Sequence, residues 1–169
     1  YLSARGRPLT FHSTGTFSIT IHIAAVSPVM RYAVIGTGYW GSNHARVAAE
    51  LADDGLIDEV FLCDVDEQRV NELAESYDVT AVTDYTQLAS HGVDAATLST
   101  PSPTHHEIAT GLLRDGIDVL VEKPLALSSK EAWDLVSTAD TEGRTLAVGH
   151  IFRHHPALCE LKRRIDRGE

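Results

Sequence analysis

From residue 30 onward, short apolar runs alternate with longer segments in which apolar side chains recur every three or four positions. Apolar runs of roughly four to eight residues between turn residues predict buried strands, and the longer pattern predicts amphipathic helices. We expect strands at residues 32–36, 59–64, 80–82, 95–99, 117–121 and 145–148. We expect helices at residues 40–51, 67–77, 85–90, 104–115, about 129–141 (after a cap at Ser128 or Ser129) and 156–167.

This alternation of strands and helices predicts the α/β fold class. Strands separated by helices form βαβ units, whose strands are parallel and whose connections are right-handed. We therefore expect a doubly wound parallel sheet with helices on both faces. Residues 30–150 form this domain in our interpretation, and residues 151–169 form a crossover that leads out of it.

The first predicted strand runs into the motif Gly-Thr-Gly-Tyr-Trp-Gly and then into a helix. In a strand–loop–helix unit, Gly36 allows the tight turn, Gly38 lets the backbone approach a diphosphate, and Gly41 lets the helix pack on the strand. The positive end of the helix would then hold the phosphates. The motif predicts a Rossmann dinucleotide-binding fold with cofactor contacts at Gly36, Thr37, Gly38, Tyr39, Trp40 and Gly41.

Asp64 ends the second predicted strand, beyond the glycine motif. A carboxylate at this position can accept hydrogen bonds from the ribose hydroxyls of the adenosine. Its charge would repel a 2′-phosphate, so the sequence favours NAD over NADP. Arg69 could weaken that preference, although it can instead be solvated or paired with Asp66. The alternative is a glycine-rich turn followed by an ordinary surface aspartate.

The end of the strand at 95–99 carries candidate residues. Thr100 and Pro101 follow the strand at 95–99 and would lie near the nicotinamide half of the cofactor, because ligands of open α/β sheets bind at the carboxyl ends of the strands. His105 begins a helix at the same edge, where it is either a cofactor contact or a capping or packing residue.

The strand at 117–121 leads into Glu122, Lys123 and a proline. We expect Glu122 and Lys123 to contact the cofactor. A lysine buried in a cleft can also act as an acid or base, or hold a substrate oxygen by charge, with Glu122 orienting it. The alternative is a surface ion pair at a strand end, which contributes little.

Arg153 lies in a histidine-rich turn after the last predicted strand. Its guanidinium can hold an anionic group of the substrate. The histidines at 150, 154 and 155 lack nearby carboxylates, so we expect no metal site here.

The overall charge and composition narrow the functional classes. The net charge of −10 disfavours nucleic-acid binding, and no apolar run is long enough for a membrane span. Two isolated cysteines fit the reducing cytoplasm, where we place the protein. Residues 1–29 contain two arginines and no acid, and we interpret them as a leader, disordered or not native to the protein, ahead of a start at Met30; a signal peptide is the alternative.

Taken in order, these motifs resemble the Gfo/Idh/MocA oxidoreductase family, which includes glucose–fructose oxidoreductase and inositol dehydrogenase. The resemblance covers the chain from about residue 30 to its end and implies the family's N-terminal NAD-binding domain. It is carried by the glycine loop 36–41 with His44, Thr100-Pro101 with His105, Glu122-Lys123-Pro124, and the turn at 149–156.

The resemblance also implies an activity and a second domain. It suggests an NAD(P)-dependent dehydrogenase that oxidises a hydroxyl of a sugar, cyclitol or nucleotide sugar, with Lys123 beside the reacting carbon. The family's C-terminal α/β domain, its Asp/His proton-transfer pair and most of its oligomer interface would lie beyond Glu169, so we expect a truncated chain here and a homo-oligomer at full length. Apolar surface at 158–165 would then be exposed and promote self-association.

Two alternatives remain open at the level of the sequence. The chain can be a module that binds NAD without turnover. It can also belong to another Rossmann family, such as the homoserine- or dihydrodipicolinate-type dehydrogenases, although these should lack the Glu-Lys-Pro motif.

Overall fold

The computed structural model describes residues 29–169, which contain one six-stranded sheet in the order β3-β2-β1-β4-β5-β6. All five strand pairs are parallel, as predicted from the alternation of strands and helices. The strands are β1 (Arg31–Ile35), β2 (Glu59–Cys63), β3 (Thr80–Val82), β4 (Ala95–Leu98), β5 (Asp118–Val121) and β6 (Leu146–Val148).

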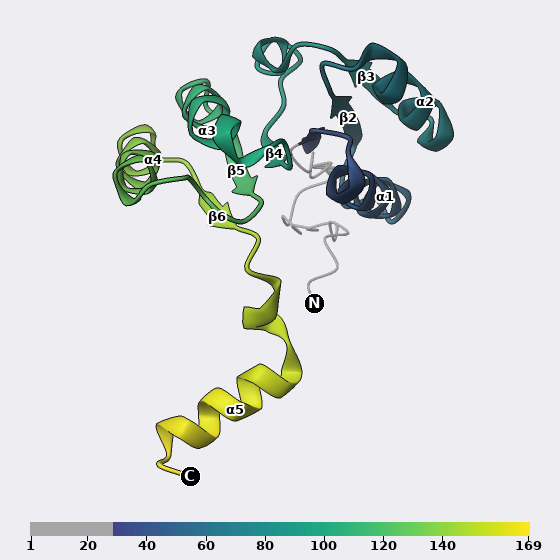
Figure 1. Ribbon diagram of the computed structural model, residues 1–169. Helices are drawn as coiled ribbons and strands as arrows, with labels where there is room; N and C mark the ends of the chain where they lie inside the picture. The colour runs from purple at the N-terminus through teal and green to yellow at the C-terminus, as the bar shows by residue number, and fades with distance from the viewer. Residues whose placement is uncertain (1–28) are drawn as a thin grey trace, which may run out of the picture.

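Helices cover both faces of this sheet, so the doubly wound Rossmann fold is confirmed (Figure 1). The helices are α1 (Tyr39–Asp53), α2 (Glu67–Tyr77), α3 (His105–Arg114), α4 (Ser129–Glu142) and α5 (Pro156–Asp166), with 3₁₀ turns η1 (Tyr85–Gln87), η2 (Ser102–Thr104) and η3 (Ile151–His154).

Successive residues of β1 face two separate cores, because side chains alternate along a strand. Val34 packs with α1 and α2 through residues such as Ala45 and Val70. Ala33 and Ile35 point to the opposite face, where α3 and α4 supply residues such as Leu112 and Leu135. The glycine loop that follows β1 is thereby anchored from both faces of the sheet.

Local signals set the helix ends within one or two residues of the predicted positions. Asp66 caps α2 by accepting a hydrogen bond from Arg69 N–H. Ser128 and Glu131 form a reciprocal capping box at the start of α4, and Gly143 ends that helix with a φ of 62°. The helix predicted at 85–90 is wrong in extent, because only the 3₁₀ turn η1 forms before the chain turns at Gly92, whose φ is 71°.

The segment after β6 is organised differently from the sheet. Figure 1 shows α5 pointing away from the sheet, and none of its residues is buried. Leu158, Leu161 and Ile165 are exposed, so the expected apolar surface at 158–165 is found. The division into residues 30–150 and 151–169 stays a prediction, and the leader expected at 1–29 lies outside the described residues except for Val29.

Two structural features of the described residues concern membrane insertion and metal binding. None of their helices is both long and apolar enough to span a bilayer. Within residues 29–169, no three His, Cys, Asp or Glu side chains are grouped as metal ligands would be. Cys63 and Cys159 are free thiols, and burial, with the nearby charges of Asp64 and Asp84, raises the pKa of the Cys63 thiol to about 12.

Candidate functional site

A cavity of about 470 Å³ lies at the carboxyl ends of β1, β2 and β4. The strand order places β1 beside both β2 and β4, so the direction of the chain's winding reverses at this point. Open α/β sheets bind ligands at such a switch point. The cavity is lined by Gly36, Gly38, Tyr39, Trp40, Asp64, Val65, Arg69, Ser99, Thr100 and Pro101.

The glycine loop has almost no room for side chains at two of its positions. A Cβ at Gly41 would lie 1.6 Å from the carbonyl oxygen of Gly36, so only glycine lets α1 pack this closely on the loop. Gly36 has a φ of 87°, and a Cβ there would lie 2.8 Å from the backbone of Ser99. A Cβ at Gly38 would meet nothing within 4 Å, so this glycine faces open space in the cavity.

The start of α1 is suited to an anion. Gly38 is its N-cap and no side chain caps the helix, so the N–H groups of the first turn are available to a ligand. The first turn carries no acidic residue that would repel a phosphate. Tyr39 and Trp40 are exposed beside this position, with their rings edge to face at 5.4 Å between centroids.

Asp64 is held in place by the glycine loop and by its own turn. Its Oδ2 accepts hydrogen bonds from Thr37 N–H at 2.7 Å and from the Thr37 hydroxyl at 2.9 Å. Its Oδ1 accepts a bond from Asp66 N–H at 3.0 Å. Thr37 is itself buried and holds Asp64 in place, and its contact with the cofactor stays a prediction.

These contacts also keep Asp64 ionised. Burial alone would raise its pKa, but the hydrogen bonds from Asp66 and Thr37, with the charge of Arg69, together lower the pKa below the ordinary 3.8. Among the described residues, Oδ1 receives only one hydrogen bond and keeps acceptor capacity toward the cavity. A ribose hydroxyl is a suitable donor for it.

Arg69 gives this end of the cavity a mixed charge. Its Nη2 lies 2.6 Å from Asp66 Oδ2 and 4.0 Å from Asp64 Oδ1, so the predicted pairing with Asp66 is found. Arg69 also lines the cavity, which the sequence did not indicate.

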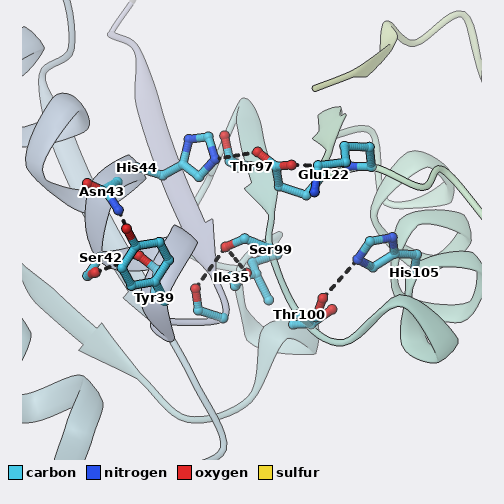
Figure 2. A network of polar contacts seen from close by, with 12 residues as sticks. Ile35, Tyr39, Ser42, Asn43, His44, Thr97, Ser99, Thr100, His105 and Glu122 are labelled. Atoms are coloured by element: carbon cyan, nitrogen blue, oxygen red, sulfur yellow. Dashed lines mark hydrogen bonds and ion pairs between the residues drawn. The ribbon is translucent and has the colours of Figure 1, made fainter. Parts of the chain in front are cut away.

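The other end of the cavity is formed by the turn after β4. Thr100 and Pro101 line it, as expected. Ser99 was not predicted; its hydroxyl donates to the carbonyl oxygens of Ile35 at 3.2 Å and Gly36 at 2.9 Å (Figure 2). Its position directly after a strand at the switch point was the signal available in the sequence. Ser99 thereby joins the turn to the glycine loop.

His105 does not lie on the cavity wall. It is only 1% exposed, and its Nε2 lies 2.9 Å from the carbonyl oxygen of Thr100 (Figure 2). Its Nδ1 lies 2.8 Å from the carbonyl oxygen of Pro124. The structure therefore places His105 behind the cavity-lining turn, as a packing residue with two polar contacts.

Glu122 pairs with a partner that the sequence analysis did not assign. Its Oε1 lies 3.0 Å from His44 Nε2 on α1, and its Oε2 accepts a hydrogen bond from the backbone N–H of Lys123 at 3.1 Å (Figure 2). A Cβ at Gly149 would lie 3.1 Å from the same carboxylate. Glu122 thus connects α1 with the ends of β5 and β6.

The structure bears on both interpretations of Lys123, the expected buried lysine and the alternative of a surface ion pair with Glu122. No ion pair joins its ammonium to Glu122 in the part of the chain that the structure describes, because the Glu122 carboxylate is turned toward His44. Lys123 is exposed rather than buried, since the chain turns outward directly after β5. Neither residue belongs to the wall of the 470 Å³ cavity among residues 29–169.

Arg153 lies apart from these groups. It is exposed in η3 and lines a second cavity of about 340 Å³ with Phe152, Leu158, Cys159 and Lys162. Its carbonyl oxygen accepts a hydrogen bond from the Cys159 thiol at 3.2 Å. The structure does not bring Arg153 to the cavity at the strand ends.

Comparison with known proteins agrees with this geometry. Residues 30–150 match the family model described as "Oxidoreductase family, NAD-binding Rossmann fold", the Gfo/Idh/MocA family. The UDP-N-acetylglucosamine 3-dehydrogenase of Acidithiobacillus ferrooxidans is 34% identical over 134 residues, which are 79% of this chain and 41% of that protein. Its solved structure matches with a TM-score of 0.70, covering 79% of this chain and 42% of that one.

Two other relatives extend the comparison. An inositol 2-dehydrogenase of Mycolicibacterium smegmatis is 34% identical over 144 residues, covering 83% of this chain and 41% of that protein. The structure of GenD2 from gentamicin A biosynthesis in complex with NAD is 34% identical, with a TM-score of 0.66, and the match covers 72% of this chain and 34% of that one. The chain therefore spans about two fifths of the length of the curated relatives it matches. The chain belongs to the Gfo/Idh/MocA oxidoreductase family and carries its NAD-binding Rossmann domain.

Proposed function

We propose that this chain is the cofactor-binding part of an NAD-dependent dehydrogenase that oxidises a hydroxyl of a sugar, cyclitol or nucleotide sugar. The observation that carries the proposal is the Asp64 carboxylate, clamped by Thr37 and lining the cavity beside the glycine loop. The relatives are named for activities on UDP-N-acetylglucosamine and on inositol, and this supports the substrate class.

The residues of the cavity fit an adenine dinucleotide. The uncapped start of α1 and the open space at Gly38 suit the diphosphate. Asp64 suits the adenosine ribose, which leaves the nicotinamide toward Thr100 and Pro101. Bound NAD supplies the hydride acceptor, and this part of the protein positions it. The negative charge of Asp64 opposes a 2′-phosphate, so we expect NAD to bind more tightly than NADP.

Lys123 is the residue that we assign to the reacting hydroxyl. Its exposed ammonium is free of ion pairs among the described residues, so it can hold the substrate oxygen by charge. Arg153 would hold an anionic substituent, such as a sugar-linked phosphate. These roles, the contact of Glu122 with the cofactor, a homo-oligomeric assembly and a cytoplasmic location remain parts of the proposal. A direct contact of His105 with the cofactor is not, because the ring is buried.

A second function is a module that binds NAD without turnover. It is favoured by one observation: in residues 29–169, the groups assigned to the substrate, Lys123 and Arg153, do not share a cavity.

Calorimetric titration of the full chain with NAD and with NADP tests cofactor binding. We expect NAD to bind and NADP to bind more weakly, and absence of NAD binding would contradict both functions. NADH formation with sugars, inositols and UDP-sugars by the whole protein that contains this chain then separates them, since the module gives no product there.

If product forms, Lys123→Ala should lower turnover by about 10²- to 10⁴-fold, the usual contribution of a positioned polar group. NAD affinity should stay unchanged. Lys130→Ala, at an exposed position of α4, is the matched control. Full turnover by Lys123→Ala would overturn the role assigned to Lys123.

A further inference from the structure

His105 is a buried polar side chain whose contacts the proposed function does not use. It lies at the first residue of α3 and is 1% exposed. Both of its ring nitrogens face backbone carbonyl oxygens: Nδ1 lies 2.8 Å from Pro124 O and Nε2 lies 2.9 Å from Thr100 O. The ring therefore fills the space between two loops that are separate in the sequence.

The chemistry of the two partners restricts the state of this ring. A carbonyl oxygen only accepts hydrogen bonds, so each contact needs an N–H on the ring. A neutral imidazole carries one N–H and would leave its second nitrogen facing an oxygen without a proton between them. The ring can donate to either loop, and it packs against both.

The two loops carry different parts of the site. Thr100 lines the cavity at the end assigned to the nicotinamide. Pro124 follows Lys123, the residue assigned to the substrate oxygen. A side chain packed between both carbonyls fixes the distance between the Thr100 turn and the Lys123–Pro124 loop, called the lysine loop below. The Glu122–His44 contact ties the end of β5 to α1 and does not restrain Thr100 (Figure 2).

We propose that His105 is a positioning residue of the cofactor site, whose buried ring contacts one loop through each ring nitrogen and so holds the Thr100 turn against the Lys123–Pro124 loop. The inference rests on the proposed function only for the statement that nicotinamide lies beside Thr100. The place of the ring between the two loops stands on the two distances and on its burial.

A pair of ligands separates positioning from a general effect on the fold. NAD and ADP-ribose share the adenosine and diphosphate, but ADP-ribose lacks the nicotinamide. His105→Phe should weaken NAD binding roughly tenfold, the lower end of what losing a supporting hydrogen bond costs at other sites. Its affinity for ADP-ribose should stay unchanged.

The neighbouring His106 supplies the matched control. Its ring points to Asp134 on α4, at 2.7 Å, so His106→Phe should leave both affinities unchanged. Equal weakening of both ligands by His105→Phe, or no change in either, would overturn the positioning role. If the wild-type chain binds neither ligand, the proposed function fails, and the ligand-free exchange measurement below tests the positioning role separately.

The link between the two loops can also be measured without any ligand. Backbone amide hydrogen exchange at Thr100 and at Leu125 should become faster in His105→Phe and stay at the wild-type rate in His106→Phe. Unchanged exchange at either position would overturn the positioning role. His105→Gln keeps a donor for one of the two carbonyls, so it also serves the binding test if His105→Phe does not fold, as judged by circular dichroism.

Discussion

The two ends of the cavity are held together in different ways. At the ribose end, Asp64 is fixed by Thr37 and Asp66, and Arg69 lies close by, all within the β1–α1–β2–α2 stretch. At the opposite end, the turn after β4 is tied to the β1 loop by Ser99, and to the loop after β5 by His105. One end is complete within a single βαβ unit and the beginning of α2, whereas the other needs segments from both halves of the sheet.

Because of this difference, substitutions at the two ends of the cavity should have effects of different size. The ribose end depends on close backbone packing in the glycine loop and on one carboxylate. The opposite end depends on several polar contacts between loops, each of which contributes less. Changes at the glycine loop should therefore have the largest effects, and changes at the Glu122–His44 contact the smallest.

The largest effect is expected from Gly41→Ala. The added Cβ would lie 1.6 Å from the Gly36 carbonyl oxygen. The backbone fixes the positions of both atoms, so neither can move away by a side-chain rotation. We expect the free energy of unfolding to fall by at least about 3 kcal/mol, as for severe overpacking, and NAD binding to be lost with the loop geometry. Urea unfolding and calorimetric titration with NAD measure the two effects.

Gly38→Ala is the control for this change. Its Cβ would meet nothing within 4 Å, so stability should stay close to that of the wild type. NAD binding should still weaken, because the methyl group occupies the space that the diphosphate needs. A Gly38→Ala chain that binds NAD normally would show that the diphosphate lies elsewhere.

A smaller effect is expected from Asp64→Asn. The amide keeps one oxygen for Thr37 but loses the charge that attracts the ribose hydroxyls, and hydrogen bonds to charged groups contribute about 1.5–3 kcal/mol. NAD affinity should fall about tenfold or more, while NADP should lose less because the repulsion of its 2′-phosphate disappears. Titration with both cofactors measures the ratio. Asp140→Asn, at an exposed position of α4, should leave it unchanged.

The same carboxylate predicts a pH dependence of stability. The pKa of Asp64 is lowered in the folded state, so the unfolded chain binds the proton more readily. The contribution of Asp64 is therefore present above its unfolded pKa of about 3.9 and is lost as the pH falls through the lower folded-state value. Urea midpoints measured from neutral pH down to about pH 3 should fall more steeply for the wild type than for Asp64→Asn; parallel curves would contradict the prediction.

The ends also differ in how well they could be predicted from the sequence. The glycine loop and Asp64 belong to a motif in which spacing alone implies geometry, so the fold and the position of Asp64 beside the loop followed from it. The partners of Glu122 and His105 could not be inferred, because His44 and Pro124 approach them only after the sheet has assembled.

Lys123 shows a second limit of prediction from sequence. An apolar strand predicts burial for its own residues, but the exposure of the next residues depends on what covers the strand end. In the described chain the loop after Glu122 turns outward, and Lys123 is exposed. The strand was therefore predicted correctly, while the environment of Lys123 was not.

The smallest effect is expected from Glu122→Gln. The side chains of His44 and Glu122 are 26% and 13% exposed, so their contact is only partly shielded from water. Removing the charge should lower the free energy of unfolding by about 0.5–1 kcal/mol, in the upper part of the range for exposed pairs. Thermal unfolding of Glu122→Gln, His44→Gln and the double variant measures the coupling between the two residues.

The size of this coupling decides whether the contact between His44 and Glu122 itself contributes to stability. If it does, the double variant should be hardly less stable than either single variant, and NAD affinity should change by less than the roughly tenfold loss expected at His105. Additive losses would show that Glu122 stabilises the β5 end through the Lys123 N–H instead, at 3.1 Å. The lysine loop would then be held by its own strand end and by His105, without help from α1.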